Sequence, residues 1–242
     1  MATRLFSRLS KQVPDWPTYL ASRAKDAKDP RLERYYASGT PDPDTPIGEV
    51  PLVAMDLETT GLDASRHGIV SIGVVPFTLE RIRLSEARYW VVAPRRPLSA
   101  ESVTFHHITH SEVASAPDLD SVLDELLACM AGRLAVVHYR PIEREFLDAA
   151  IHERLDEHLL FPMIDTMSLE AVRHRRRHWL WLRRLMGRPP ASIRLHESRQ
   201  RYNLPAYTGH HALSDALATA ELLQAQIARH YSWQTPVGTF WR

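Results

Sequence analysis

The chain has 242 residues, of which 44% are hydrophobic and 24% charged, and its formal net charge is +1. These values are typical of a soluble globular protein with one domain of about 180 residues and flanking segments. No apolar run reaches the length of a membrane span, the N-terminus lacks a signal-peptide core, and the single Cys129 excludes an intrachain disulfide. We therefore expect a cytoplasmic protein.

The first 48 residues are expected to form a helical extension followed by a linker. Leu5, Phe6 and Leu9 recur at helical spacing, and a second, polar helix is predicted from about Ala21 to Ala37. The stretch from Gly39 to Pro46 holds three prolines and predicts an extended connection. The predicted divisions are 1–48 for the extension and linker, 49–230 for the main domain and 231–242 for an aromatic C-terminal tail that folds back on the domain.

The main domain has the order of elements that is typical of an α/β fold. Three segments of strand character come first, and helices and strands then alternate. This pattern predicts a mixed five-stranded sheet with helices on its faces. The predicted elements are strands from Leu52 and over Ile69–Val75 and Ala87–Val92, a helix over Asp118–Met130, a strand over Leu134–Val137, a helix that holds Glu143, a short helix over Leu155–Leu160, a strand over Met163–Asp165 and a long helix from Ala212.

Two carboxylates stand at the end of the first predicted strand. Asp56 and Glu58 lie two residues apart, after the apolar run Val53–Met55 and before the turn Thr59–Gly61. Residues at this spacing in a strand point to the same face. Because a buried charge is costly without a cation, the pair favours a site for a hard divalent metal such as Mg²⁺ or Mn²⁺. For the pair alone, an ordinary polar strand end remains the alternative.

Further segments resemble, in the same order, the motifs of the DEDDh 3′→5′ exonucleases, a DnaQ-like family that includes the proofreading epsilon subunit of bacterial DNA polymerase III. Asp56–Leu62 matches the first motif, Asp-x-Glu-Thr-Thr-Gly-Leu, residue for residue, and His210–Ala216 matches the third, His-x-Ala-Leu-x-Asp-Ala. His138–Glu143 resembles the second motif, and Phe105–Thr109 resembles a further family segment. The resemblance covers residues 50 to 230 and implies an RNase H-like fold.

The resemblance also implies a catalytic site that holds two metal ions, Mg²⁺ or Mn²⁺. Asp56 would bridge both ions, and Glu58 and Asp215 would complete the site of the ion that generates hydroxide. Glu143 would help to hold the second ion. His210 would be the general base that takes a proton from the attacking water.

Substrate contacts follow from the same resemblance. Thr59 and the backbone around Gly61 and Leu62 would hold the 3′-terminal nucleotide, and Leu62 would pack against its base. His106 would lie at the same pocket, with a structural role as the alternative.

The second motif departs from the family pattern at two positions. The family has His-Asn-x-x-Phe-Asp, whereas this chain has Tyr139 in place of Asn and Glu143 in place of Asp. Glu143 keeps the charge but is longer by one methylene, so the second ion must be held with shifted geometry. Mg²⁺ demands near-octahedral geometry. We therefore expect a working site that favours Mn²⁺.

Four other polar residues near the motifs are not expected to bind metal. Asp148 is expected to be a solvated helix residue, and His138 a hydrogen-bonding structural residue. Asp165, within a segment that resembles a structural Asp-Thr pair of the family, is expected to brace a turn. His211 is expected to be exposed at the surface.

The charge distribution is uneven between Ala171 and Tyr202, which hold ten arginines against a single acid, Glu197. Trp179 and Trp181 lie inside this stretch. Guanidinium groups with interleaved aromatic residues suit phosphate contact and base stacking. A solvated helix whose tryptophans pack on the core is the alternative.

The sequence therefore predicts a metal-dependent 3′→5′ exonuclease that hydrolyses single-stranded nucleic acid, with DNA preferred, to nucleoside 5′-monophosphates. One alternative is an exoribonuclease for short oligoribonucleotides or RNA 3′ tails, because the motifs do not show whether the pocket accepts a 2′-hydroxyl. Another is an accessory protein that binds nucleic acid with an impaired catalytic site. A polymerase or repair partner and the oligomeric state are left open.

Overall fold

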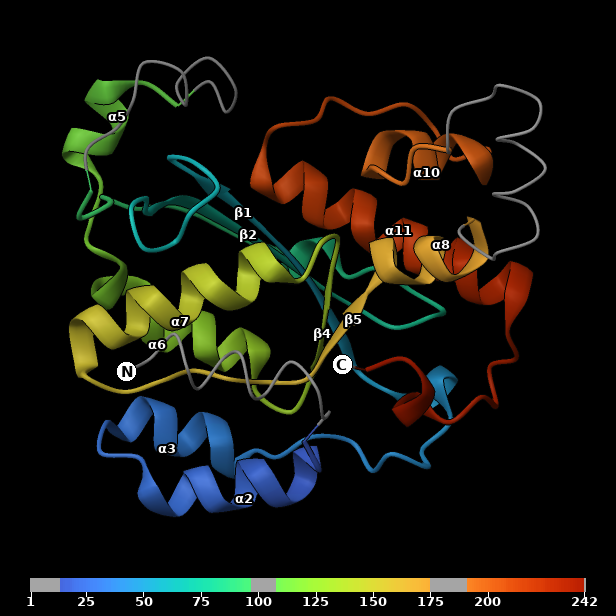
Figure 1. Ribbon diagram of the computed structural model, residues 1–242, viewed down its shortest axis with the longest axis horizontal. Coiled ribbons are helices and arrows are strands. Elements are labelled where there is room, and N and C mark those ends of the chain that lie inside the picture. Colours follow the sequence, from blue (N-terminus) through green and yellow to red (C-terminus); the bar gives the residue numbers. More distant parts are fainter. Residues whose placement is uncertain (1–13, 97–107, 175–190, 242) are drawn as a thin grey trace.

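The computed structural model describes residues 14–96, 108–174 and 191–241. These residues form a central five-stranded sheet with helices packed around it (Figure 1). Its strands are Leu52–Thr59 (β1), Ile69–Phe77 (β2), Arg88–Val91 (β3), Leu134–Val137 (β4) and Met163–Asp165 (β5). The strand order is β3-β2-β1-β4-β5. The β1–β2 and β2–β3 pairs are antiparallel, whereas β1–β4 and β4–β5 are parallel. This confirms the predicted mixed sheet.

Helices cover both faces of the sheet. In the main domain they are α5 (His110–Ser115), α6 (Leu119–Met130), α7 (Pro141–Leu155), α8 (Thr166–His174), α10 (Leu195–Arg201) and α11 (Ala212–His230), with short 3-10 helices η1 (Ile47–Glu49), η2 (Leu84–Glu86) and η3 (Val237–Thr239). Val53 and Met55 of β1 join the core beneath α6 and α7, whereas Leu52 and Ala54 join the core beneath α11 (Figure 1). Asp56 and Glu58 continue the second series, so they face α11.

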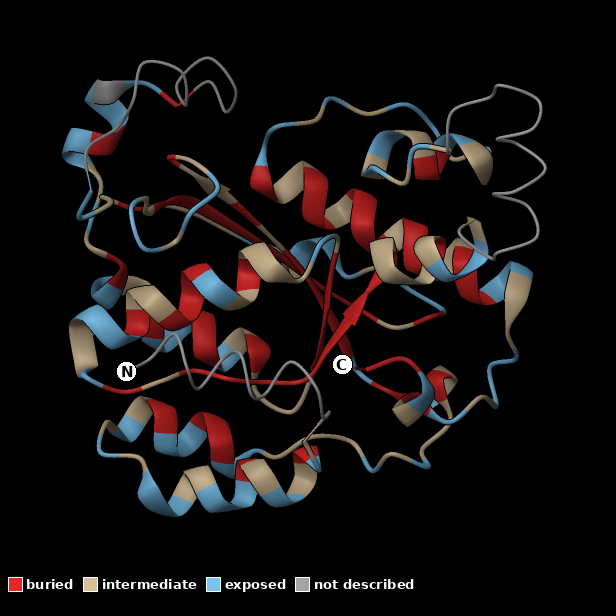
Figure 2. Ribbon diagram, in the orientation of Figure 1, coloured by how far each residue is buried: buried red, intermediate tan, exposed pale blue. Residues whose placement is uncertain are grey.

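Buried residues are concentrated in the sheet and on the helix sides that face it (Figure 2). All residues of β2, β4 and β5 are buried, as expected for strands covered on both faces. None of the helices in the described part of the chain has the length and hydropathy that a membrane span requires.

The region before the sheet forms two helices, α2 (Trp16–Asp26) and α3 (Pro30–Ala37), and not the single helix predicted over Ala21–Ala37. Pro30 has no backbone N–H and disfavours helical geometry in the residue before it, so a continuous helix cannot pass through it. The Asp29 carboxylate instead caps α3 by accepting the Arg31 N–H at 2.8 Å. The predicted helix around Leu5 to Val13 lies outside the described residues.

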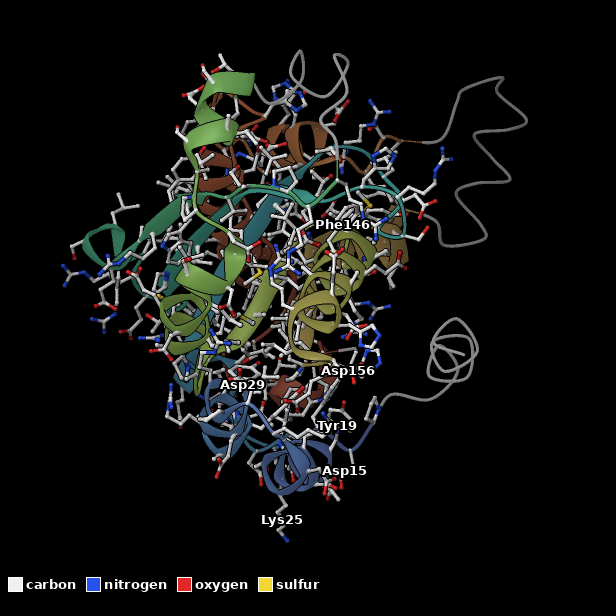
Figure 3. The ribbon with its side chains drawn as sticks, turned by 90° about the vertical axis from the view of Figure 1, so that its left-hand side faces the viewer. Asp15, Tyr19, Lys25, Asp29, Phe146 and Asp156 are labelled. Carbon is white, nitrogen blue, oxygen red and sulfur yellow. The ribbon has the colours of Figure 1, made fainter. Side chains whose placement is uncertain are left out.

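The turn between α2 and α3 is fixed to the main domain by Glu157. Its carboxylate accepts the backbone N–H groups of Lys28 at 3.0 Å and Asp29 at 2.7 Å. Figure 3 shows Lys25 of α2 pointing away from the molecule at the outer side of this helix pair. The helix pair therefore packs against the main domain through the side opposite Lys25. The predicted division between extension and main domain at residue 48 stays a prediction.

The C-terminal tail folds back on the domain, as expected. Pro236 pairs with Pro46 in an antiparallel bridge, and Trp241 pairs in the same way with Ile164 of β5. The Gly238 N–H donates to the Pro43 carbonyl oxygen at 2.9 Å. The tail thus covers the outer edge of β5 and holds the linker that precedes the sheet.

Two predictions near the end of α7 are wrong. The short helix predicted over Leu155–Leu160 is absent: α7 itself runs to Leu155, Asp156 follows with a left-handed φ of 54°, and residues 157–162 are not helical. Asp148 is not solvated but 4% exposed. Its carboxylate accepts the Leu159 N–H at 2.9 Å and contacts His158 Nδ1 at 3.1 Å. The extended segment has no helical hydrogen bonds of its own, and Asp148 supplies an acceptor for it.

Candidate functional site

Three carboxylates meet at the C-terminal end of β1. Asp56 and Glu58 project from the strand, and Asp215 projects from the first turns of α11. Each offers an oxygen atom, and these three oxygen atoms all lie within 4.8 Å of one another. The spacing predicted for Asp56 and Glu58 thus brings both to one point, and the helix that follows the third motif adds Asp215.

The close approach of α11 depends on a glycine in β2. Gly73 pairs with Asp56 across the β1–β2 ladder. A Cβ atom at Gly73 would overlap the carbonyl group of Ala212 and the nitrogen of Leu213, both in the first turn of α11. Only the absence of a side chain there lets α11 rest directly on the sheet and bring Asp215 to Asp56. The glycine in the middle of a strand that is otherwise apolar except for Ser71 was the available sequence signal for this contact.

Asp215 is held in place by donors from the segment before α11. The His211 N–H donates to its Oδ2 atom at 3.1 Å, and the Tyr207 hydroxyl and the backbone N–H of His210 lie next to the same carboxylate. These neighbours favour the ionised form, but burial outweighs them and raises the pKa of Asp215.

The carboxylates raise one another's pKa values. Burial raises the pKa of Asp56 well above its usual range, and the charges of Asp215, Glu143 and Glu58 raise it further. Burial, with Asp215 as the second cause, raises the pKa of Glu58 to about 7. These three described neighbours therefore all oppose the ionisation of Asp56, a situation that a bound divalent cation would reverse.

Glu143 lies beside the cluster and not within it. It belongs to the first turn of α7, and it is not one of the three residues whose oxygens meet within 4.8 Å. It is 2% exposed, and its Oε2 atom has no hydrogen-bond partner among the described residues. Burial, followed by the charge of Asp165, raises its pKa well above the usual range. An orphaned buried carboxylate oxygen next to three convergent acids fits a site for hard cations.

The free energy of unfolding of the metal-free protein is expected to fall as the pH rises. The pKa of Glu58 is about 7 in the folded protein against 4.5 for an ordinary glutamate. A raised pKa contributes stability that is complete below about pH 4.5 and is lost as the pH passes 7. Urea unfolding with a chelator, between about pH 5 and pH 8, measures this loss. Glu58→Gln should flatten the curve; an equally steep curve in that variant would contradict the assignment.

The two histidines of the third motif differ in their surroundings. His210 is exposed, has a left-handed φ of 64°, and lines the same pocket as the three acids. His211 is exposed, as predicted, and its ring stacks on Tyr89 of β3 at 4.5 Å between ring centroids. The stack anchors the segment before α11 to the edge strand β3.

The loop after β1 folds back on itself. The Thr59 hydroxyl donates to the Gly61 carbonyl oxygen at 2.8 Å. A Cβ atom at Gly61 would lie 2.6 Å from His67 Nε2, so a side chain at this position would require the His67 ring to move. Leu62 is 83% exposed. His106, the remaining residue of the predicted substrate pocket, lies outside the described residues.

His138 and Asp165, which were expected to have structural roles, both make hydrogen bonds that hold neighbouring segments together. His138 Nδ1 contacts the Thr166 hydroxyl at 2.8 Å, and its Nε2 contacts the Ile193 carbonyl oxygen at 3.1 Å. Asp165 Oδ1 accepts the N–H groups of Tyr139 at 3.1 Å and Met167 at 3.0 Å. Tyr139, which stands where the family motif has Asn, has a φ of 91° that the bond to Asp165 holds in place.

The pocket above the acids has a second wall that the sequence did not reveal. Residues of α10 and its cap, together with the segment before α11, line it opposite Asp56 and Glu58. These wall residues are Arg194, Leu195, His196, Glu197, Tyr207 and Gly209. These residues lie between the second and third motifs, so the motifs do not indicate where they sit relative to the acids. The rest of the arginine-rich stretch, residues 175–190, lies outside the described residues.

The model of the exonuclease family RNase_T matches residues 53–223, well over half of the chain. The chain belongs to this exonuclease family. The sequence match contains the β1 carboxylates, Glu143 and Asp215, so the site described above lies within the family domain. Exonucleases of this kind generally use divalent metal ions, and the acidic cluster is a candidate site for them.

Two relatives with similar sequences are named as epsilon or epsilon-like proteins of DNA polymerase III. An epsilon-like protein of DNA polymerase III from Rhodobacter capsulatus is 31% identical over 183 residues, and the match covers 74% of this chain but 24% of the relative. The DNA polymerase III epsilon subunit of Treponema pallidum is 26% identical, with 75% of this chain and 78% of the relative covered. The exonuclease thus spans about a quarter of the length of the first relative.

Solved structures share the fold. Exonuclease X in complex with 5′-overhanging duplex DNA superposes with a TM-score of 0.57 at 23% identity, covering 77% of this chain and 97% of the other. The nuclease domain of 3′hExo, a DEDDh family member, gives 0.61 at 16% identity, covering 74% and 92%. Both likenesses establish the RNase H-like exonuclease fold expected from the sequence.

Proposed function

We propose that this exonuclease acts in the 3′→5′ direction on single-stranded nucleic acid, with DNA preferred, and releases nucleoside 5′-monophosphates one at a time. The observation that carries the proposal is the convergence of Asp56, Glu58 and Asp215 within 4.8 Å, beside buried Glu143 and on one pocket with His210. The epsilon subunits among the relatives and the structure of Exonuclease I with a dT13 oligonucleotide support DNA as the substrate.

The acids would hold two ions, Mg²⁺ or Mn²⁺. Asp56, Glu58 and Asp215 would hold one ion, and Glu143 would join Asp56 at the second. Ions held there would activate a water for attack and would neutralise charge on the scissile phosphate and the departing 3′ oxygen. Asp215 is buried and Asp56 and Glu58 are partly buried, and this limited exposure to water strengthens the electrostatic interactions of the carboxylates.

His210 would act as the general base. It lines the pocket of the acids, and its exposed ring can reach a water that attacks from the solvent side. An imidazole nitrogen would accept the proton of that water. The hydrogen bond from the His211 N–H to Asp215 fixes the backbone that carries this ring.

The 3′-terminal nucleotide would lie over the loop after β1. Thr59 and the tightly packed backbone at Gly61 would contact it, and the exposed Leu62 would pack against its base. His106 stays part of this proposed pocket. Single-stranded 3′ ends are the expected partners, and association with a polymerase or repair complex is a further proposal drawn from the relatives' names.

The test uses 5′-labelled single-stranded DNA and RNA of the same sequence with the purified protein in Mg²⁺ or Mn²⁺. A ladder that shortens from the 3′ end and is lost in Asp56→Ala is the expected result. The ratio of DNA to RNA rates decides between the proposal and an exoribonuclease. Intact oligomers in both metals, with binding retained, would overturn the proposal and identify an accessory nucleic-acid-binding protein.

Glu143→Asp is expected to lower turnover in Mg²⁺. The shorter side chain withdraws the carboxylate from a position that α7 fixes by burial. A misplacement of about 1 Å at a catalytic site can cost about 10²-fold in rate. Single-turnover rates of both proteins in Mg²⁺ and Mn²⁺ measure the effect. A large gain in the variant would show instead that Glu143 impairs the native site.

A further inference from the structure

Tyr207 lies on the pocket wall and reaches Asp215. It belongs to the segment between α10 and α11 and lines the same pocket as Asp56 and Glu58. Its hydroxyl lies beside the Asp215 carboxylate: a Cβ atom built on Gly209 would stand 3.8 Å from the Tyr207 hydroxyl and 3.7 Å from Asp215 Oδ1. This hydroxyl comes from outside the three motifs of the family.

The Tyr207 ring is itself held by a buried arginine. The Arg199 guanidinium lies 4.9 Å from the ring centroid, a cation–π contact, and Arg199 is 3% exposed. Its Nη2 atom forms an ion pair with Glu221 of α11 at 2.7 Å. One charged group therefore joins the wall of the pocket to α11.

Two further hydrogen bonds of Arg199 fix the geometry of this connection. Nη1 donates to the Ala218 carbonyl oxygen of α11 at 2.8 Å, and Nη2 donates to the Pro205 carbonyl oxygen at 3.0 Å. Ala218 lies about one helical turn after Asp215. The same side chain thus fixes both the segment that carries Tyr207 and the helix that carries Asp215.

A buried arginine with its ion pair is costly to desolvate and contributes little net stability compared with apolar packing. What it supplies here is a fixed relative position for two elements that meet at the acids. The hydroxyl of Tyr207 is aimed at the one carboxylate of the cluster that is not on β1. Groups that hydrogen-bond a metal-binding carboxylate orient it and tune its affinity.

We propose that Tyr207, held by Arg199, is a positioning residue that orients the Asp215 carboxylate for binding a divalent cation. This proposal rests on the proposed function of the site. It adds a residue outside the motifs to the machinery and assigns a role to the segment between α10 and α11.

The test is Mn²⁺ binding to the full-length protein, measured by isothermal titration calorimetry without nucleic acid. Tyr207→Phe keeps the ring and removes the hydroxyl, and we expect Mn²⁺ affinity to fall by about 10- to 100-fold. Arg199→Lys should shift the affinity in the same direction, because lysine cannot make the planar contacts of a guanidinium. The exonuclease rate of Tyr207→Phe should recover toward that of the wild type at high Mn²⁺.

Tyr202→Phe is the matched control, because its hydroxyl donates to Glu170 at 2.7 Å, away from the acids. Its Mn²⁺ affinity should equal that of the wild type, and thermal unfolding identifies any variant that fails to fold. Equal Mn²⁺ affinity in Tyr207→Phe and wild type would overturn the positioning role while leaving the proposed function intact. Absence of Mn²⁺ binding to the wild type would overturn both.

Discussion

Replacing Asp56 by asparagine is expected to reduce exonuclease turnover by about 10³-fold or more while stabilising the metal-free protein. The loss corresponds to about 4 kcal/mol of transition-state stabilisation that a metal site supplies. The gain in stability arises because Asp56 is the carboxylate whose pKa all three other acids raise. Removing its charge relieves that repulsion in the absence of a cation.

Thermal unfolding with a chelator and with Mn²⁺ measures both effects. The wild type should be stabilised by Mn²⁺, since a ligand that binds only the folded state raises its stability, whereas Asp56→Asn should not respond. Asp124→Asn is the matched control, because Asp124 pairs with Arg34 on the exposed surface. Its activity and its response to Mn²⁺ should be those of the wild type. A lower unfolding temperature of Asp56→Asn in chelator would refute the repulsion argument.

Gly73→Ala is expected to lower Mn²⁺ affinity and turnover together, although residue 73 bears no functional group. Its new methyl group would overlap the first turn of α11, so the helix must move away from β2 and take Asp215 with it. Overpacking of this kind costs about 1–3 kcal/mol of stability. Calorimetric Mn²⁺ titration beside urea unfolding separates the displacement of Asp215 from the loss of stability.

Gly132→Ala provides the control for that loss of stability. Gly132 has open space around it but a φ of 66°, so an alanine there is strained by about 1–2 kcal/mol without touching the site. Its Mn²⁺ affinity should be unchanged. If Gly73→Ala lost stability but bound Mn²⁺ as tightly as Gly132→Ala, the contact with α11 would not be what places Asp215.

The parts of the site that lie on regular elements were predictable from the sequence. Asp56 and Glu58 share a face because strands have a period of two, and the apolar stripe of α11 places Asp215 at the sheet. The mixed character of the sheet and its flanking helices follow from the order of strands and helices along the chain. These inferences use only local periodicity and chain order, which the sequence displays directly.

The parts that depend on contacts through space were not predictable in the same way. Asp148 has the local pattern of a solvated helix residue, yet a segment ten residues later covers it and uses its carboxylate. Tyr207 and Arg199 have their proposed roles because of their contacts with the acids and with α11. No motif indicates how α11 packs against the pocket wall. Glu143 keeps the charge of its motif, but only the fold shows that it lies buried beside the cluster of acids.

The bridge between Trp241 and Ile164 has a consequence for solubility. β5 is an edge strand of the sheet, and an exposed edge offers unpaired backbone groups to a neighbouring molecule. The tail occupies part of that edge with its own backbone. A chain cut after residue 230 would keep every proposed catalytic residue and still open the β5 edge to self-association. Protection against aggregation therefore depends here on a segment that lies outside the matched family domain.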